Sequence, residues 1–173
     1  MKGNVLSLTF SYASDVTVVL TSCGRFDLLE TTIESFIRFN QHPIKHFIII
    51  EDSGDDAVYG CVPELYRQYF TFLINKSKLG QIKSIDKAYS LVDTPYIFHC
   101  EDDWVFYRYG FIEDSKLLLE ANKDILQVWL RSYYHDIKVH SGYHYQGERQ
   151  QISGVYYYRV MSHKPDWQGF FQS

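Results

Sequence analysis

Apolar residues in the first hundred positions fall into two alternating patterns, short continuous runs and stretches with helical spacing. Val16 to Thr21 is a β-branched apolar run, and after a polar turn the apolar residues recur at helical spacing up to Ile37. Phe47 to Ile50 is a second short run, of the kind that is buried on both faces in a parallel sheet. The pattern predicts a strand, a helix that ends near Asn40 to Pro43, and a second strand.

The same alternation continues as far as Cys100. We expect a helix around Pro63 to Phe70, a strand at Phe72 to Asn75, a helix with its apolar face between Ile82 and Tyr89, and a strand over Pro95 to Cys100. Strands that alternate with helices at this spacing are joined by right-handed crossovers and form a mostly parallel sheet covered on both faces. The predicted fold class is therefore α/β.

The pattern weakens after residue 103. Phe111 to Asn122 is typical of a helix and Ile125 to Leu130 of a strand. Tyr143 to Gln146 and Val155 to Met161 flank the polar segment Gly147 to Ser153, which predicts a small β-hairpin or flap near the C-terminus.

Length and composition set broad limits. A chain of 173 residues without an internal repeat or linker fits one domain, 1–173. Its closing segment, Asp166 to Ser173, ends on apolar residues without a stop signal, so we expect a C-terminal truncation. With 46% hydrophobic and 22% charged residues the chain is a packed globular protein rather than a disordered one. The formal net charge of -4 provides no basic surface, so we expect no nucleic-acid partner.

Cysteine usage and hydropathy bear on the cellular compartment. Cys23, Cys61 and Cys100 are odd in number and widely spaced, which favours neither a disulfide framework nor a zinc site and suits a reducing compartment. Met1 to Tyr12 lacks the apolar core of a signal peptide, and no stretch approaches the roughly 20 apolar residues that span a bilayer. We expect no membrane segment in this chain and a cytoplasmic location, although excision from an anchored protein would leave the same pattern.

A polar cluster follows each of the four predicted strands. The clusters are Thr21 to Arg25, Glu51 to Gly54, Lys76 to Gln81, and Glu101 to Asp103. The carboxyl ends of parallel strands share one edge, where ligands bind in such sheets, so the clusters predict one site. Three successive carboxylates at a strand end repel one another, and a divalent cation relieves that repulsion best. The alternative is a solvated acidic turn.

These four clusters, in this order and spacing, resemble successive motifs of GT-A-fold glycosyltransferases of the family 2 type. Glu101-Asp102-Asp103-Trp104 stands in the place of their DXD motif, and the match spans roughly Val16 to Phe106. The resemblance implies a Rossmann-like sheet that binds a nucleoside-diphosphate sugar, UDP-linked, with Mn²⁺ or Mg²⁺ as cofactor. It also implies transfer of the sugar, with inversion, to a hydroxyl of a carbohydrate or glycoconjugate acceptor.

The resemblance assigns roles to the acidic triplet. Asp103 is the implied metal ligand, Asp102 faces the ribose and Glu101 the donor sugar, with plain structural hydrogen bonding as the alternative for the last two. His163 lies in the part of the chain from which some similar enzymes recruit a late metal ligand. A cation between a carboxylate and the diphosphate neutralises the charge that develops on the leaving nucleotide.

Four further residues are implied in donor binding at the first two strand ends. Thr21 and Ser22 lie where the nucleoside sits in similar enzymes. Asp52 resembles the acid that reads a pyrimidine N–H, and its alternative role is to cap the next turn. Arg25 meets the diphosphate or is an exposed charge in the first turn of its helix.

The remaining candidates lie later in the chain. Gly80 allows a ligand to approach the backbone at a helix start, and Lys83 points back to the site or pairs with Asp86. Inversion needs a carboxylate that removes the acceptor proton. Asp166 is one candidate for this base, and the alternative is a residue beyond Ser173.

Two rival functions stay open. A sugar-phosphate nucleotidyltransferase would use a similar sheet, but it should have a glycine-rich loop after the first strand, where Ser22 to Arg25 has a single glycine. A non-catalytic carbohydrate-binding or scaffold domain is favoured by the 15 tyrosines.

Overall fold

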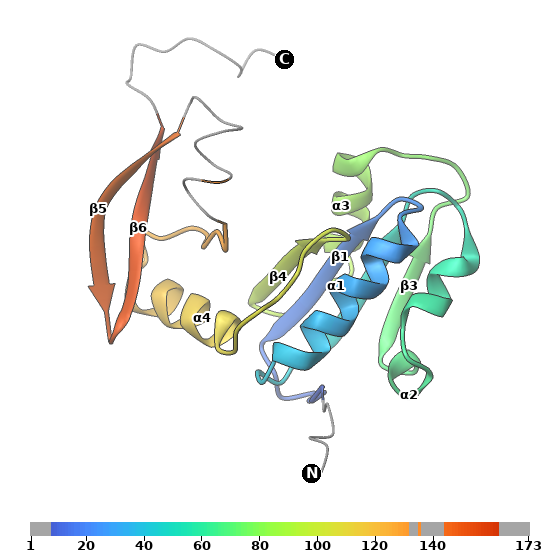
Figure 1. Ribbon diagram of the computed structural model, residues 1–173, viewed down its shortest axis with the longest axis horizontal. Coiled ribbons are helices and arrows are strands. Elements are labelled where there is room, and N and C mark those ends of the chain that lie inside the picture. The colour runs from blue at the N-terminus through green and yellow to red at the C-terminus, as the bar shows by residue number, and fades with distance from the viewer. Residues whose placement is uncertain (1–7, 132–134, 136–143, 163–173) are drawn as a thin grey trace. The chain divides into compact units, whose positions relative to one another are not determined.

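The computed structural model describes residues 8–131, 135 and 144–162. The chain separates into two compact units, Met1–Ile112 and Glu113–Ser173, and each is described by itself. The first contains a sheet and its helices, and the second contains a hairpin (Figure 1). The prediction of one domain over 1–173 stays a prediction.

A four-stranded sheet in which every pairing is parallel is the centre of the first unit. Its strands are β1 (Val16–Ser22), β2 (His46–Glu51), β3 (Phe70–Ile74) and β4 (Tyr96–Glu101). They lie in the order β3-β2-β1-β4, and their parallel pairing requires a crossover between successive strands. This arrangement confirms the predicted α/β class.

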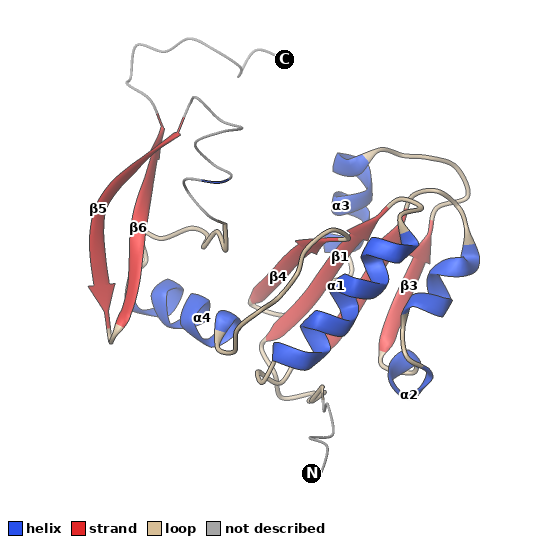
Figure 2. Cartoon of the chain, in the orientation of Figure 1, coloured by secondary structure: helices blue, strands red, loops and turns tan. Residues whose placement is uncertain are grey.

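Helices lie on both faces of this sheet (Figure 2). Among the described residues the α-helices are α1 (Phe26–Phe39), α2 (Glu64–Arg67), α3 (Gln81–Tyr89) and α4 (Phe111–Ala121), and η1 (Asp56–Cys61) is a 3-10 helix. On one face, Phe36 of α1 contacts the rings of Phe47 and Phe98 at centroid distances of 5.2 and 5.9 Å. On the other face, Ala88 of α3 packs in a cluster with Val19 and Ile48. Burial on both faces explains the continuous apolar runs of β1 and β2.

Two of the predicted elements are wrong. The segment 125–130 is not a strand, because it pairs with no strand among the described residues, and Leu126 is 93% exposed. A strand needs a neighbour for its backbone hydrogen bonds, which a short apolar run does not supply. The helix expected over 63–70 is only the single turn α2, because Phe70 begins β3, where it lies opposite Phe47 and stacks on its ring at 4.3 Å.

The predicted hairpin is confirmed, but its turn lies elsewhere. Strands β5 (His144–Ile152) and β6 (Val155–Ser162) are antiparallel, with only Ser153 and Gly154 between them. Both turn residues have positive φ, 47° and 89°, as a tight two-residue hairpin turn requires. The polar residues expected in the loop therefore continue strand β5.

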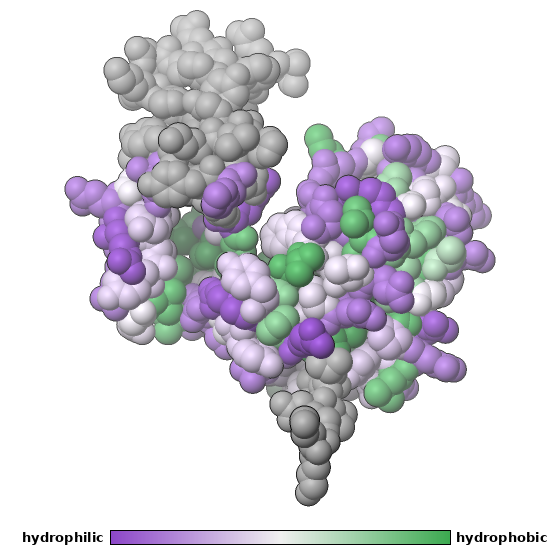
Figure 3. All heavy atoms as spheres, viewed as in Figure 1, coloured by the Kyte–Doolittle hydropathy of each residue, from purple (hydrophilic) through white to green (hydrophobic). Residues whose placement is uncertain are grey.

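The surface is mixed in character. On the face in Figure 3, apolar residues occur in small groups between hydrophilic ones. Within the described ranges, no helix has the length and hydrophobicity needed to cross a membrane.

Candidate functional site

The carboxyl ends of the four parallel strands carry the polar clusters to one edge of the sheet. Ser22 lies opposite Glu51 on the neighbouring strand, and Thr21 lies opposite Glu101 on the other side. Backbone bonds extend this alignment past the strand ends, since the Asp52 amide donates to the Ser22 carbonyl at 2.9 Å. The prediction that these polar segments share one edge of the sheet is confirmed. We call this edge, at the carboxyl ends of the four strands, the rim.

Strand alternation divides the rim into two clusters, because successive side chains point to opposite faces of a sheet. The α1-side cluster is Ser22, Arg25, Glu51, Asp102 and Asp103, and its contacts are with the turn that starts α1. The α3-side cluster is Asp52, Asn75, Gln81, Ser84 and Glu101, and its contacts are with the start of α3. The adjacent acids Glu51 and Asp52 thus belong to different clusters, as do Glu101 and Asp102.

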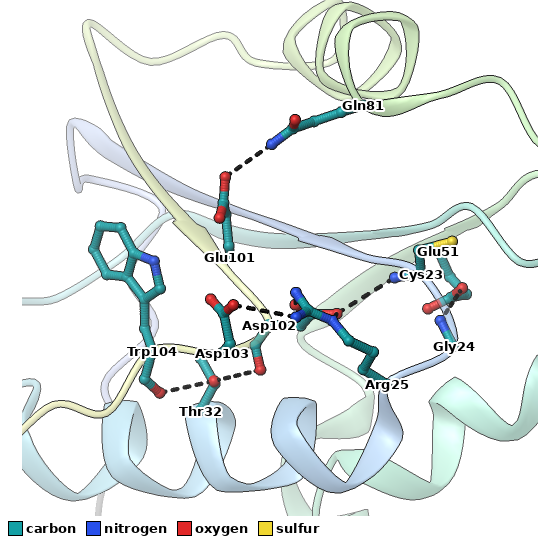
Figure 4. Close-up of polar contacts among 10 residues, drawn as sticks. All are labelled: Cys23, Gly24, Arg25, Thr32, Glu51, Gln81, Glu101, Asp102, Asp103 and Trp104. Atoms are coloured by element: carbon teal, nitrogen blue, oxygen red, sulfur yellow. Dashed lines mark hydrogen bonds and ion pairs between the residues drawn. The ribbon is translucent and has the colours of Figure 1, made fainter. Parts of the chain in front are cut away.

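Arg25 joins the two aspartates of the α1-side cluster (Figure 4). Its Nε donates to Asp102 Oδ2 at 3.2 Å, its Nη2 pairs with Asp102 Oδ1, and its Nη1 donates to Asp103 Oδ2 at 3.2 Å. The Asp102 side chain is 2% exposed, whereas those of Arg25 and Asp103 are 49% and 42% exposed. The hydrogen bond to Asp102 is the main cause that raises the pKa of Arg25. The guanidinium therefore binds the buried Asp102 through two nitrogens and the exposed Asp103 through one.

Two hydroxyl groups of α1 hold the backbone of the acidic loop. Thr32 is fully buried, and its Oγ1 lies 2.8 Å from the carbonyl oxygens of both Asp102 and Trp104 (Figure 4). Ser35 Oγ accepts from the amide of Phe106 at 3.1 Å. Neither residue is among those that the sequence predicts for the site. The available signal was a pair of hydroxyl residues, three positions apart, on an otherwise apolar helix face.

Glu51 is a fully buried acid for which the sequence predicts no role beyond membership of a polar cluster. Its Oε1 accepts from the amides of Gly24 at 3.0 Å and Ser53 at 2.7 Å, so it fixes the turn before α1. Glu51 Oε2 and Ser22 Oγ are both buried and have no hydrogen-bond partner among the described residues.

Asp52 organises the α3-side cluster. Its carboxylate accepts from the amides of Leu79 and Gly80 and from the Asn75 side chain, each at 2.8 Å. Burial would raise the pKa of Asp52, but these bonds and one from Ser84 outweigh it and lower that pKa. Asp52 therefore caps the distant loop 75–80 and not the turn that follows it, where the Ser53 amide donates to Glu51 instead. The predicted contact with a base stays a prediction.

The other predicted residues of this cluster are more accessible. Gly80 has a φ of +85°, and a side chain added there would meet no atom within 4 Å, so a ligand could approach its backbone. Glu101 accepts from Gln81 at 2.8 Å, and Lys83 is exposed on α3. Asp166 and His163 lie outside the described residues.

The acidic pair suits a hard divalent cation with phosphate as co-ligand. Among the described residues, no group of three or more His, Cys, Asp or Glu side chains could hold a metal ion by itself. Asp102 and Asp103 nevertheless direct carboxylate oxygens at one cationic group, the guanidinium of Arg25. Mg²⁺ is commonly bound by one or two carboxylates together with substrate phosphates, so these two residues fit such an ion.

No family model matches the sequence, and no curated protein matches it either.

Proposed function

We propose that this chain is a GT-A-type glycosyltransferase domain that binds a nucleoside-diphosphate sugar together with Mn²⁺ or Mg²⁺. It transfers the sugar to a hydroxyl of a carbohydrate or glycoconjugate acceptor. The observation that carries the proposal is the convergence of Asp102 and Asp103 on one cationic group, at the edge of a parallel sheet that also carries three other polar clusters.

Different residues of the rim would bind different parts of this donor. Asp103, the exposed acid, would hold the cation, and the bound cation would neutralise charge on the leaving nucleotide. Arg25 lies beside it at the start of α1, where a guanidinium and a helix N-terminus both favour an anionic diphosphate. Asp102 orients Arg25, and Thr32 fixes the loop that carries both acids.

The α3-side cluster would contribute to the sugar and nucleoside. Thr21 lies near the end of β1, and Glu101, half-buried beside Gln81, would accept from a donor hydroxyl. Asp52 shapes the 75–80 loop and leaves Gly80 open for close approach. The proposal also includes a preference for UDP and inversion of configuration. Asp166 is the candidate within this sequence for the base that inversion needs.

A second candidate is a non-catalytic carbohydrate-binding domain, which the hairpin favours. Tyr156 and Tyr158 are 56% and 48% exposed and lie on one face of β6, since alternate strand residues share a face. The Arg149 guanidinium lies 3.8 Å from the centre of the Tyr156 ring. Exposed aromatic rings beside a hydrogen-bond donor can stack on sugars.

Calorimetric titration with UDP and GDP, with and without Mn²⁺, tests the main proposal. We expect Mn²⁺-dependent binding of UDP to the wild-type chain and its loss in Asp103→Ala. Asp56→Ala removes another exposed acid, on η1, and should bind like the wild type. Failure of both nucleotides to bind in the presence of Mn²⁺ would refute the donor site and leave the carbohydrate-binding candidate.

A further inference from the structure

Arg25 occupies an unusual position for an arginine. It is the N-cap residue of the 14-residue helix α1, and its side chain makes no capping hydrogen bond. Helices prefer Ser, Thr, Asp or Asn at this position, and a positive charge is disfavoured at the positive end of the helix dipole. Two local preferences are thus broken at the candidate site, which is where such exceptions are expected to serve function.

The two ion pairs of Arg25 are unequal. Asp102 is buried, receives two nitrogens of the guanidinium and also lies 3.4 Å from the Cys23 amide. Asp103 is exposed and receives one nitrogen at 3.2 Å. An exposed single-bond ion pair is weak because water screens it, whereas a buried pair is costly to break. The Asp103 contact can therefore open while Asp102 keeps the guanidinium in place.

The turn that carries Arg25 also lies beside unused polar groups. Ser22 Oγ and Glu51 Oε2 are buried at the ends of β1 and β2 and have no partner among the described residues. Buried polar atoms in native proteins are nearly always hydrogen-bonded, so this turn has the character of a site that a polar ligand completes.

We propose that Arg25 is a displaceable counter-ion of Asp103, which exchanges the guanidinium for a divalent cation when the donor binds. This rests on the function proposed above. Before binding, Asp103 pairs with Arg25, and the cation pairs with the diphosphate in solution. After binding, Asp103 pairs with the cation, and Nη1 of Arg25 donates to a phosphate oxygen. The cation would keep its diphosphate partner throughout, so every charged group has an oppositely charged partner both before and after the exchange.

This exchange couples the two ligands. A cation that arrives alone has to displace Arg25, and a nucleotide that arrives alone meets a guanidinium already occupied by Asp103. The two together satisfy both groups, so each should raise the affinity for the other. Arg25 thus weakens the binding of the metal when the diphosphate is absent and itself contacts the diphosphate when it is present.

Binding measurements on the full chain test the exchange, with Mn²⁺ alone, UDP alone and both together. Asp103→Asn leaves the Asp102 pair intact and frees Nη1, so UDP without a cation should bind about fivefold more tightly than to the wild type. Arg25→Gln should bind Mn²⁺ alone about fivefold more tightly and should lose most of the coupling between Mn²⁺ and UDP. Arg25→Lys, which keeps a charge beside Asp102, replaces Arg25→Gln if the latter does not fold.

Matched controls are Arg38→Gln, at the exposed far end of α1, and Asp56→Asn, which should both bind like the wild type. The exchange would be overturned if two affinities are unchanged from the wild type: that of Asp103→Asn for UDP alone and that of the Arg25 variant for Mn²⁺ alone. This holds even if the wild type binds UDP with Mn²⁺. Tighter Mn²⁺ binding by the Arg25 variant, without UDP binding by any variant, would support the competition and refute the proposed function. Binding of neither ligand to any variant would overturn both.

Discussion

The buried hydroxyl of Thr32 provides a direct test of how the acidic loop is held. Thr32 Oγ1 lies 2.8 Å from the Asp102 and Trp104 carbonyls, and one hydroxyl proton is shared between these two acceptors. Thr32→Val keeps the shape of the side chain and removes the donor. Threonine and valine have similar helix propensities, so the helix itself should be little affected.

The expected loss comes from the carbonyls left without a donor. A buried polar group that loses its partner costs about 1–3 kcal/mol, and the Asp102 contact is fully buried. We therefore expect Thr32→Val to lower the free energy of unfolding by about 1–3 kcal/mol. The measurement is urea denaturation followed by circular dichroism and linear extrapolation. Mn²⁺-dependent UDP binding should weaken in the same variant, because the loop that carries Asp103 is released.

The neighbouring residue offers a matched control. Thr31 is exposed, and its hydroxyl donates to the Asp27 carbonyl of its own helix at 3.1 Å. Thr31→Val should change stability by less than about 0.5 kcal/mol, as surface substitutions usually do. Equal losses in the two variants would show that the contacts of Thr32 with the loop do not stabilise the fold, and the reasoning would be refuted.

Three further predictions concern the rim and the sheet. Gly54→Ala should lower the free energy of unfolding by about 1–3 kcal/mol, because φ is +83° and the new Cβ would lie 3.1 Å from the Asn75 carbonyl oxygen. Gly60→Ala is the control, since its Cβ would meet nothing within 4 Å. Similar urea midpoints for the two variants would contradict this prediction. The lowered pKa of Asp52 stabilises the fold fully above its usual value of 3.8, and this stabilisation is lost as the pH falls further. Asp52→Asn should therefore show a smaller loss of stability in acid, and an unchanged acid profile would count against it. Burial lowers the pKa of His99 below its usual 6.5, so the stability of the fold should fall as the pH drops below that value. His99→Gln should remove this pH dependence. If the dependence persists in the variant, His99 is not its source.

The sheet and its rim could be predicted from the sequence because β1 and β2 are continuous apolar runs that end in polar residues. A run buried on both faces has no alternation of polar and apolar residues, however, so it does not reveal which face each terminal acid joins. The sequence therefore predicts a base contact or a turn cap for Asp52 and no role for Glu51. The structure places Asp52 among loop amides and buries Glu51 beneath the turn of Gly24.

The contacts that hold the acidic loop could not be predicted from local pattern. Thr32 and Ser35 bond to residues about seventy positions away in the chain, and only the packing of α1 on the sheet brings them together. The same limit applies to the segment 125–130, whose apolar residues resemble a strand although no described strand pairs with it. Both depend on partners distant in the sequence.

Helix α1 connects the aromatic core to the candidate site. Arg25 is its N-cap residue, Thr32 is two turns further along, and Phe36 lies among the rings of the core. A rise of about 1.5 Å per residue puts Phe36 about 16 Å from Arg25 along the helix axis. A core substitution that shifts or tilts helix α1 would move the Arg25 guanidinium relative to Asp102 and Asp103, although the substituted residue contacts none of these side chains. The geometry of the candidate site therefore depends on packing in the hydrophobic interior as well as on the residues of the rim.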